Sequence, residues 1–204
     1  MRESTNFLLA GVGGQGTILA SDVLVNVGLA AGYQAKQAEV HGMSQRGGSV
    51  TSFVRWGRTV YSPLVGAGEV DVLLAFEKAE ALRNLKQLRP GALALINLTS
   101  ILPVTVTSGG QVYPDDDTLR QKISQVTTKM IYVDGEAAAA ELGNIKAANV
   151  VLLGALSALM EREGLTGPEL SADTWLKVIT ERVPPKFVDL NRQAFSAGRK
   201  TVTG

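Results

Sequence analysis

The clearest indication of the fold is the segment Phe7-Leu8-Leu9-Ala10-Gly11-Val12-Gly13-Gly14-Gln15-Gly16. Its first four residues are apolar, and its last six fit the pattern G-x-G-x-x-G. Apolar residues then recur at helical spacing through residues 17–31, and Gly32 ends that pattern. A strand, a glycine turn and a helix in this order predict the opening of a βαβ unit.

This glycine turn suits a negatively charged ligand. Glycines permit tight turns and positive φ angles, and without Cβ atoms they let a ligand approach the backbone. The N-terminus of the following helix presents unpaired N–H groups, which favour a phosphate or carboxylate. Glu39, at the end of the second expected strand, falls near the place of the ribose-binding acid in dinucleotide folds. Two alternatives stay open, because the glycines can serve close strand–helix packing alone or the docking of a partner's backbone.

A second glycine-rich loop, His41-Gly42-Met43-Ser44-Gln45-Arg46-Gly47-Gly48, follows a strand expected at residues 33–40. In a doubly wound fold this loop lies beside the first turn, in the crevice where such sheets bind ligands. Its arginine can form paired hydrogen bonds to a carboxylate or phosphate, and its histidine can transfer protons near neutral pH. The simpler alternatives are that His41 caps the strand end and that Arg46 pairs with Glu39 or Asp71.

The remainder of the chain alternates strands and helices, which predicts an α/β fold with a mainly parallel sheet covered on both faces. Strands are expected at residues 49–56, 70–76, 92–97 and 130–133, with short strand-like pieces within 104–113 and a hairpin joining 49–56 to 59–61. Helices are expected at residues 78–88, 115–126, 136–142, 149–163, 171–182 and 187–198. We therefore predict a Rossmann-like three-layer sandwich with a helical C-terminal portion, formed by residues 1–204 as one domain.

Two groups of acidic residues favour structural roles. Glu77, Glu80 and Arg83 are spaced along the expected helix 78–88, where we expect a solvated face with local ion pairs. The three aspartates at 115–117 suit the start of a helix better than a cation site, because acidic residues stabilise a helix N-terminus. Ser171 is the expected N-cap of the helix that follows it.

Several apolar and small residues predict packing. Trp56 and Trp175 are expected in the core or at an interface. The expected helix 149–163 carries the small residues Gly154, Ala155 and Ala158, which suit close packing on another helix. That second helix can belong to this chain or to a partner.

The composition excludes several classes of protein. The 204 residues have a net charge of +1, which gives no electrostatic footprint for nucleic acid or an anionic membrane surface. The absence of cysteine excludes thiolate catalysis and cysteine-ligated iron–sulfur clusters on this chain, and a single histidine argues against a self-contained zinc site. The polar start of the chain and the lack of a long apolar run predict a cytoplasmic protein.

The two glycine-rich stretches together resemble the signature of a known family. The run from Gly11 to Gly16, followed by Glu39-Val40-His41-Gly42-Met43-Ser44-Gln45-Arg46-Gly47-Gly48, is similar to the paired signature of gamma subunits of 2-oxoacid:ferredoxin oxidoreductases. The Glu-Val-His-Gly-Met form resembles in particular the small, or beta, subunits of indolepyruvate ferredoxin oxidoreductases. Asn149 before Leu152-Leu153-Gly154-Ala155, and Pro185-Lys186 before Asn191 and Phe195, agree with it, so the resemblance spans nearly the whole chain.

The resemblance implies a non-redox subunit of an enzyme that oxidatively decarboxylates a 2-oxoacid, such as indolepyruvate, to an acyl-CoA and passes electrons to ferredoxin. It implies that thiamine diphosphate, Mg²⁺, iron–sulfur clusters and coenzyme A act in the complex with a large subunit. This chain alone is then expected to bind no cofactor and to be inactive, and a homodimer of the isolated chain is compatible with the resemblance. The lack of cysteine and of a Gly-Asp-Gly motif agrees with that division.

The residues expected at a ligand or at the partner interface come from the two loops and the strand end, with no catalytic residue and no metal site assigned: Gly11, Gly13, Gly14, Gln15, Gly16, Glu39, His41, Gly42, Gln45, Arg46, Gly47 and Gly48. The alternative function is a free-standing NAD(P)- or FAD-binding Rossmann oxidoreductase that uses the glycine turn and Glu39. A third hypothesis is a stand-alone binding or assembly module.

Overall fold

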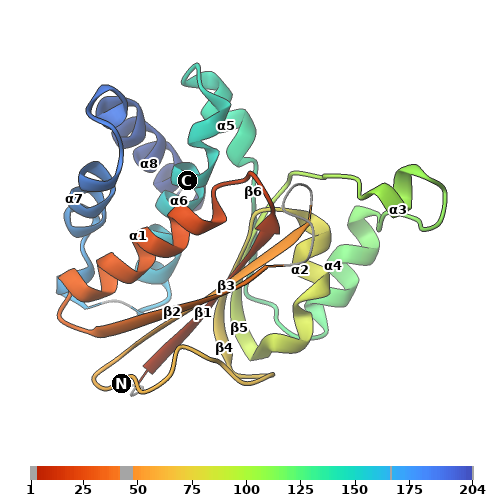
Figure 1. The fold of residues 1–204 in the computed structure, drawn as a ribbon, viewed down its shortest axis with the longest axis horizontal. Coiled ribbons are helices and arrows are strands. Elements are labelled where there is room, and N and C mark those ends of the chain that lie inside the picture. Colours follow the sequence, from red (N-terminus) through yellow and green to blue (C-terminus); the bar gives the residue numbers. More distant parts are fainter. Residues whose placement is uncertain (1–3, 42–47, 166, 204) are drawn as a thin grey trace.

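A computed structural model describes residues 4–41, 48–165 and 167–203. Its strands are β1 (Ser4–Val12), β2 (Gln34–His41), β3 (Ser49–Gly57), β4 (Val70–Ala75), β5 (Leu88–Asn97) and β6 (Met130–Val133). They form a six-stranded sheet in the order β2-β3-β1-β4-β5-β6 (Figure 1). Each pair from β1 through β6 in that order is parallel, whereas β3 is antiparallel to both of its neighbours. The predicted mainly parallel sheet is confirmed.

Helices cover both faces of the sheet, as predicted. They are α1 (Thr17–Ala30), α2 (Lys78–Arg83), α3 (Val104–Thr107), α4 (Asp116–Ser124), α5 (Gly135–Glu141), α6 (Ala148–Arg162), α7 (Ala172–Arg182) and α8 (Val188–Thr203). Figure 1 shows α1 and the C-terminal helices on one face and α2 and α4 on the other, which gives the three layers. No helix within the described ranges is long and apolar enough to cross a membrane.

The predicted hairpin between residues 49–56 and 59–61 is wrong. β3 alternates buried and half-buried residues, as expected, but it pairs with β2 on one side and β1 on the other. Its Val54 lies opposite both Gln37 and Phe7, so neither backbone edge of β3 is left for residues 59–61. The nine-residue β1 and the eight-residue β2 offer β3 a longer ladder of hydrogen bonds than a three-residue strand can.

The region after β4 also differs from the prediction. α2 ends at Arg83, and β5 begins at Leu88 instead of residue 92. Residues 104–113, expected as strand-like pieces, contain the helical turn α3 because this segment leaves the sheet and has no neighbouring strand to pair with.

The predicted caps are confirmed, since the side chains of Asp115 and Ser171 accept the backbone N–H groups of residues 118 and 174.

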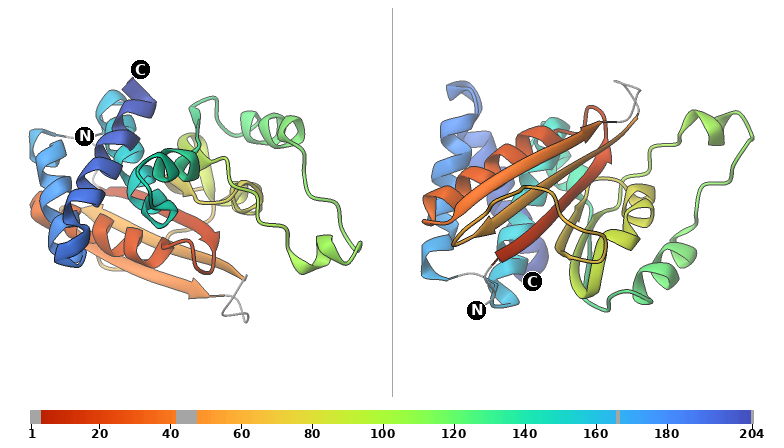
Figure 2. Two further views of the ribbon diagram at one scale, coloured as in Figure 1. Left: turned by 90° about the horizontal axis from the view of Figure 1, so that it is seen from above. Right: turned by 60° about the horizontal axis from the view of Figure 1, so that its bottom comes forward.

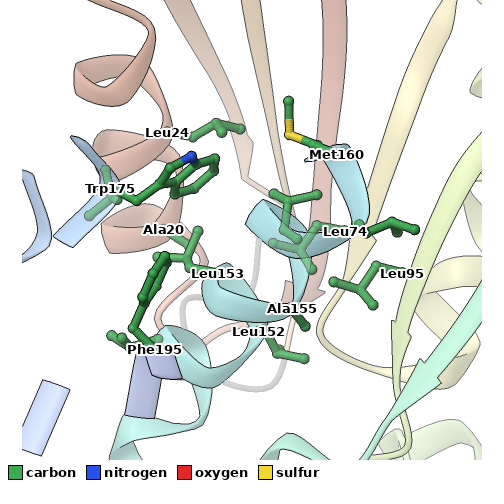
Figure 3. Packing of buried hydrophobic residues seen from close by; sticks show 14 of the residues in the cluster. Ala20, Leu24, Leu74, Leu95, Leu152, Leu153, Ala155, Met160, Trp175 and Phe195 are labelled. Atoms are coloured by element: carbon green, nitrogen blue, oxygen red, sulfur yellow. The ribbon is translucent and has the colours of Figure 1, made fainter. Parts of the chain in front are cut away.

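The larger core lies between the sheet and the C-terminal helices. Residues 149–160 of α6 are all buried, which is typical of a helix surrounded by protein on all sides. Figure 3 shows Leu74 and Leu95 of the sheet on one side of α6, and Trp175 and Phe195 on the other. The exposed fractions of Trp56 and Trp175 are 3% and 0%, so the core prediction for both tryptophans is confirmed.

The small residues of α6 allow its backbone to touch that of α8. A Cβ atom on Gly154 would lie 2.1 Å from the carbonyl oxygen of Phe195, and one on Gly198 would lie 1.8 Å from that of Val151. The helix that α6 was predicted to pack against therefore belongs to this chain. Glycines at both contacts let the axes of α6 and α8 approach closely.

We expect Gly154→Ala to lower the free energy of unfolding by about 1–3 kcal/mol, because the added methyl group forces α6 and α8 apart. Urea denaturation of the purified chain measures this change. Ser196→Ala, on the exposed side of α8, is the matched control and should change stability by less than about 0.5 kcal/mol. Equal stability of the Gly154→Ala variant and the wild type would contradict the close contact.

Candidate functional site

The glycine turn joins the carboxyl end of β1 to the first turn of α1. Gly14 and Gly16 have φ angles of 104° and 78°, in the left-handed region that favours glycine. A Cβ atom on Gly11 would come within 3.0 Å of Phe76 Cβ, so this glycine serves close packing at the end of β4. A Cβ atom on Gly14 would meet no described atom within 4 Å, so the backbone there is open to a ligand.

Two amide side chains tie together the ends of three parallel strands. Gln15 Oε1 accepts the N–H of Val12 at 2.8 Å, and Gln15 Nε2 donates to the carbonyl oxygen of Phe76 at 2.9 Å. Asn97 Nδ2 donates to the same carbonyl oxygen at 3.1 Å, and its Oδ1 accepts the N–H of Gly135 at 2.9 Å. The glutamine of the glycine motif therefore positions the turn on the sheet.

The end of the second loop lies beside this turn. Gly13 donates its N–H to the carbonyl oxygen of Gly48 at 3.0 Å, and Ser49 pairs with Val12 where β3 begins. Ser49 Oγ also donates to Glu80 Oε2 at 2.6 Å. The inserted strand β3, and not β2 as expected, brings the two segments together.

The expectation of a solvated face at Glu77 and Glu80 is wrong, although the expected local ion pair forms between Arg83 and Glu80. The exposed fractions of Glu77 and Glu80 are 1% and 2%, and both belong to the beginning of α2, which follows the carboxyl end of β4. Glu77 is the N-cap of α2 and accepts the N–H of Glu80 at 2.9 Å. The sequence does carry a signal for this N-cap. Glu77 follows the strand expected at residues 70–76, and a second glutamate comes three residues later, which is the spacing of a capping box.

Burial is the main cause that raises the pKa of the Glu80 carboxyl above its ordinary value. The hydrogen bond from Ser49 and the adjacent Arg83 guanidinium oppose that shift, while the charge of Glu77 adds to it. Arg83 also donates to Glu80. Glu80 is thus a buried carboxylate whose hydrogen bonds hold the start of β3 against α2.

A pocket of about 300 Å³ opens at the glycine turn. It is lined by Val12, Gly13, Gly14, Gly16, Thr17, Ile18 and Val50. No side chain caps the N-terminus of α1 there, and the buried hydroxyl of Thr17 has no hydrogen-bond partner among the described residues. Asn149, at the start of α6, places its amide against Gly16. Open backbone, a free helix N-terminus and uncharged polar groups suit the binding of an anionic group.

The structure separates the remaining predicted residues. Glu39 pairs with Ser52 of β3, so a whole strand lies between Glu39 and β1. In a dinucleotide fold the ribose-binding acid ends the strand directly beside β1, and Glu39 does not occupy that place. His41 ends β2 opposite Val50. The predictions for the rest of the second loop lie outside the described residues: Gly42, Gln45, Arg46 and Gly47.

The described residues supply binding groups to this edge of the sheet. They contribute open backbone at Gly14, the uncapped start of α1 and the hydroxyl of Thr17, whereas the buried carboxylates of Glu77 and Glu80 accept hydrogen bonds within the chain. Among the residues that the structure describes, no three His, Asp or Glu side chains are grouped closely enough to hold a metal ion. The arrangement can hold and orient a ligand or a partner.

We expect the pH dependence of stability to change in the Glu80→Gln variant. A carboxyl with a raised folded-state pKa contributes stability that is fully present below its ordinary value of 4.5 and lost as the pH rises through the folded-state pKa. Between about pH 4 and pH 8 the free energy of unfolding of the wild type should therefore fall relative to that of the variant, as urea denaturation measures. Ser49→Ala removes a bond that favours the ionised form, so it should steepen the fall. Parallel profiles for wild type and Glu80→Gln would contradict this account.

Proteins of known family are similar to this chain over nearly its whole length. The family model for pyruvate ferredoxin/flavodoxin oxidoreductase matches residues 6–201. Indolepyruvate oxidoreductase subunit IorB of Thermococcus kodakarensis is 42% identical over 96% of this chain and 94% of that protein. The same subunit of Pyrococcus horikoshii is also 42% identical, with the same coverage.

A solved structure agrees with the curated relatives. The gamma subunit of a keto/oxoacid ferredoxin oxidoreductase from Geobacter sulfurreducens is 25% identical to this chain, and the alignment covers 98% of each with a TM-score of 0.70. The resemblance inferred from the two glycine-rich stretches is confirmed. The chain belongs to the pyruvate ferredoxin/flavodoxin oxidoreductase family.

Proposed function

We propose that this chain is the non-redox small subunit of a thiamine-diphosphate-dependent 2-oxoacid:ferredoxin oxidoreductase, with indolepyruvate or a related aryl pyruvate as substrate. The observation that carries the proposal is the match, over nearly the full length of both chains, to small subunits of indolepyruvate oxidoreductases. The substrate loses CO₂ and two electrons, its acyl group is transferred to the sulfur of coenzyme A, and the electrons pass to ferredoxin. The chain takes part in this reaction only within the complex.

We assign the cofactors to the large subunit because this chain lacks the groups that would hold them. Iron–sulfur clusters are held by cysteine thiolates, and this chain has none, so they do not fit here. The chain also lacks a Gly-Asp-Gly motif for the metal and diphosphate of thiamine diphosphate. Thiamine diphosphate, bound by the large subunit, would supply the group that stabilises negative charge during decarboxylation. The large subunit, and through it ferredoxin, are therefore the proposed partners.

The glycine turn is the part of this chain that we assign to the shared active centre. Its open backbone at Gly14 and the uncapped end of α1 fit a phosphate or carboxylate. Coenzyme A and the 2-oxoacid both carry such groups. Gln15 and Gly48 hold the turn in place, so the uncapped N–H groups at the start of α1 are oriented before a ligand arrives. The other residues of the second loop complete the proposed interface.

The position of Glu39 favours this proposal over a free-standing NAD(P)- or FAD-dependent enzyme. The interposed β3 separates Glu39 from β1 by two strand spacings, about 10 Å. A ribose hydroxyl bound at the turn would thus lack the acid that dinucleotide folds place there.

We expect oxidation of indolepyruvate only when both subunits are present. The purified chain, the purified large subunit and their mixture are each supplied with indolepyruvate, thiamine diphosphate, Mg²⁺, coenzyme A and oxidised ferredoxin, and ferredoxin reduction is followed by absorbance. Activity should appear in the mixture and be absent from each subunit alone. Turnover by this chain alone would refute the proposal.

We expect Gly14→Ala to reduce the activity of the complex at least about tenfold, because the methyl group covers the open backbone and disturbs the left-handed turn. Gly32→Ala is the matched control, since Gly32 has a φ angle of 83° and equally open surroundings at the other end of α1. Both variants should lose about 1–2 kcal/mol of stability from backbone strain. Full activity of the Gly14→Ala complex would remove the turn from the active centre.

A further inference from the structure

A long arm projects from the sheet between β5 and α4. It consists of residues 98–114 and carries α3 near its tip. Both views in Figure 2 show it, in light green, extending away from the rest of the molecule. α3 has no buried residue, so the arm does not contribute to the core.

The arm is uncharged and exposes several apolar side chains. Residues 98–114 include no Asp, Glu, Lys or Arg, whereas such residues make up 19% of the whole chain. The exposed fractions of Leu102, Val104 and Val112 are 52%, 81% and 94%. A single exposed apolar residue is ordinary, but a projection that combines several with no charge is typical of a surface that a partner covers.

The arm is held in one shape at both ends. At its base, the buried carboxylate of Glu77 accepts the N–H of Ile101 at 3.1 Å and the hydroxyl of Tyr113, so one group fastens the outgoing and the returning segment of the arm. At its tip, Gln111 donates its N–H to the carbonyl oxygen of Thr105 at 2.9 Å. A segment that is already ordered loses less conformational entropy when it binds.

The arm starts at the same edge of the sheet as the glycine turn. It leaves β5 directly after Asn97, whose amide shares the carbonyl oxygen of Phe76 with Gln15. Glu77, which fastens the arm, is the next residue after Phe76. The arm is shorter than the roughly 20–30 residues that each side of a standard interface contributes, so it extends a neighbouring interface better than it forms one alone.

We propose that this arm docks in an uncharged, apolar groove of the large subunit and extends the interface formed at the glycine edge. The inference rests on the proposed function, which supplies the large subunit as the partner. Its own content is that residues 98–114 are a docking element, fastened by Glu77, whose apolar side chains become buried in the complex.

The first test introduces a charge into the arm. Val112→Asp and Val104→Asp should each weaken binding of the chain to the purified large subunit at least about tenfold in biolayer interferometry, because the new carboxylate would be buried without a partner. Leu64→Asp is the matched control: Leu64 is 66% exposed in the connection from β3 to β4, at the opposite edge of the sheet. It should leave the affinity within about twofold.

The second test probes coverage of the arm directly. Because the chain has no cysteine, Val112→Cys and Leu64→Cys each introduce a single thiol. Maleimide labelling, read by mass spectrometry of this chain, should slow at least about tenfold at position 112 on addition of the large subunit and remain unchanged at position 64. This measurement holds even if a charged variant folds poorly.

The outcomes separate the two proposals. If the wild-type chain does not bind the large subunit, the proposed function falls and this inference falls with it. If the wild type binds but the Val112→Asp variant binds equally and position 112 stays reactive, the arm inference alone is overturned. If position 112 is instead protected by self-association of the isolated chain, as sedimentation velocity would detect, the occupant is a second copy and the proposal is also overturned.

Discussion

The carbonyl oxygen of Phe76, at the end of β4, is the point on which the carboxyl edge of the sheet depends. Gln15 and Asn97 both donate to it, one from the turn after β1 and the other from the end of β5. A carbonyl oxygen has two lone pairs, and here both neighbouring strands use them. The three strand ends are thereby held together, and the glycine turn, α5 and the arm all start beside them.

Two buried glutamates extend this constraint to the elements around the edge. Glu80 holds the beginning of β3 through Ser49, and Glu77 holds the outgoing and the returning segment of the arm. Buried carboxylates are costly unless they accept hydrogen bonds, and each of these two accepts several. The hydrogen bonds that satisfy the two carboxylates therefore fix the start of β3 and the base of the arm.

The insertion of β3 adapts a nucleotide-binding type of fold to another use. It separates β2 from β1 while it brings Gly48 to the turn at Gly13. Glu39 of β2 is displaced from the glycine turn, and Gly48, directly before β3, lies beside the turn instead. This arrangement agrees with the proposal that the glycine turn and the large subunit bind one ligand together. The turn offers backbone groups for binding, while the chain contains no cysteine for iron–sulfur clusters.

Local residue patterns suffice to predict the strand–turn–helix opening, the α/β class, the positions of most helices and the family, because these features depend on helical spacing and on the two glycine-rich stretches. The caps at Asp115 and Ser171 were predictable for the same reason. The partners of β3, the burial of Glu77 and Glu80, and the hydrogen bonds of Gln15 to the sheet became visible in the folded chain alone. Each of these depends on contacts between segments far apart in the chain, and local residue patterns do not encode which distant backbone group a strand or side chain will meet.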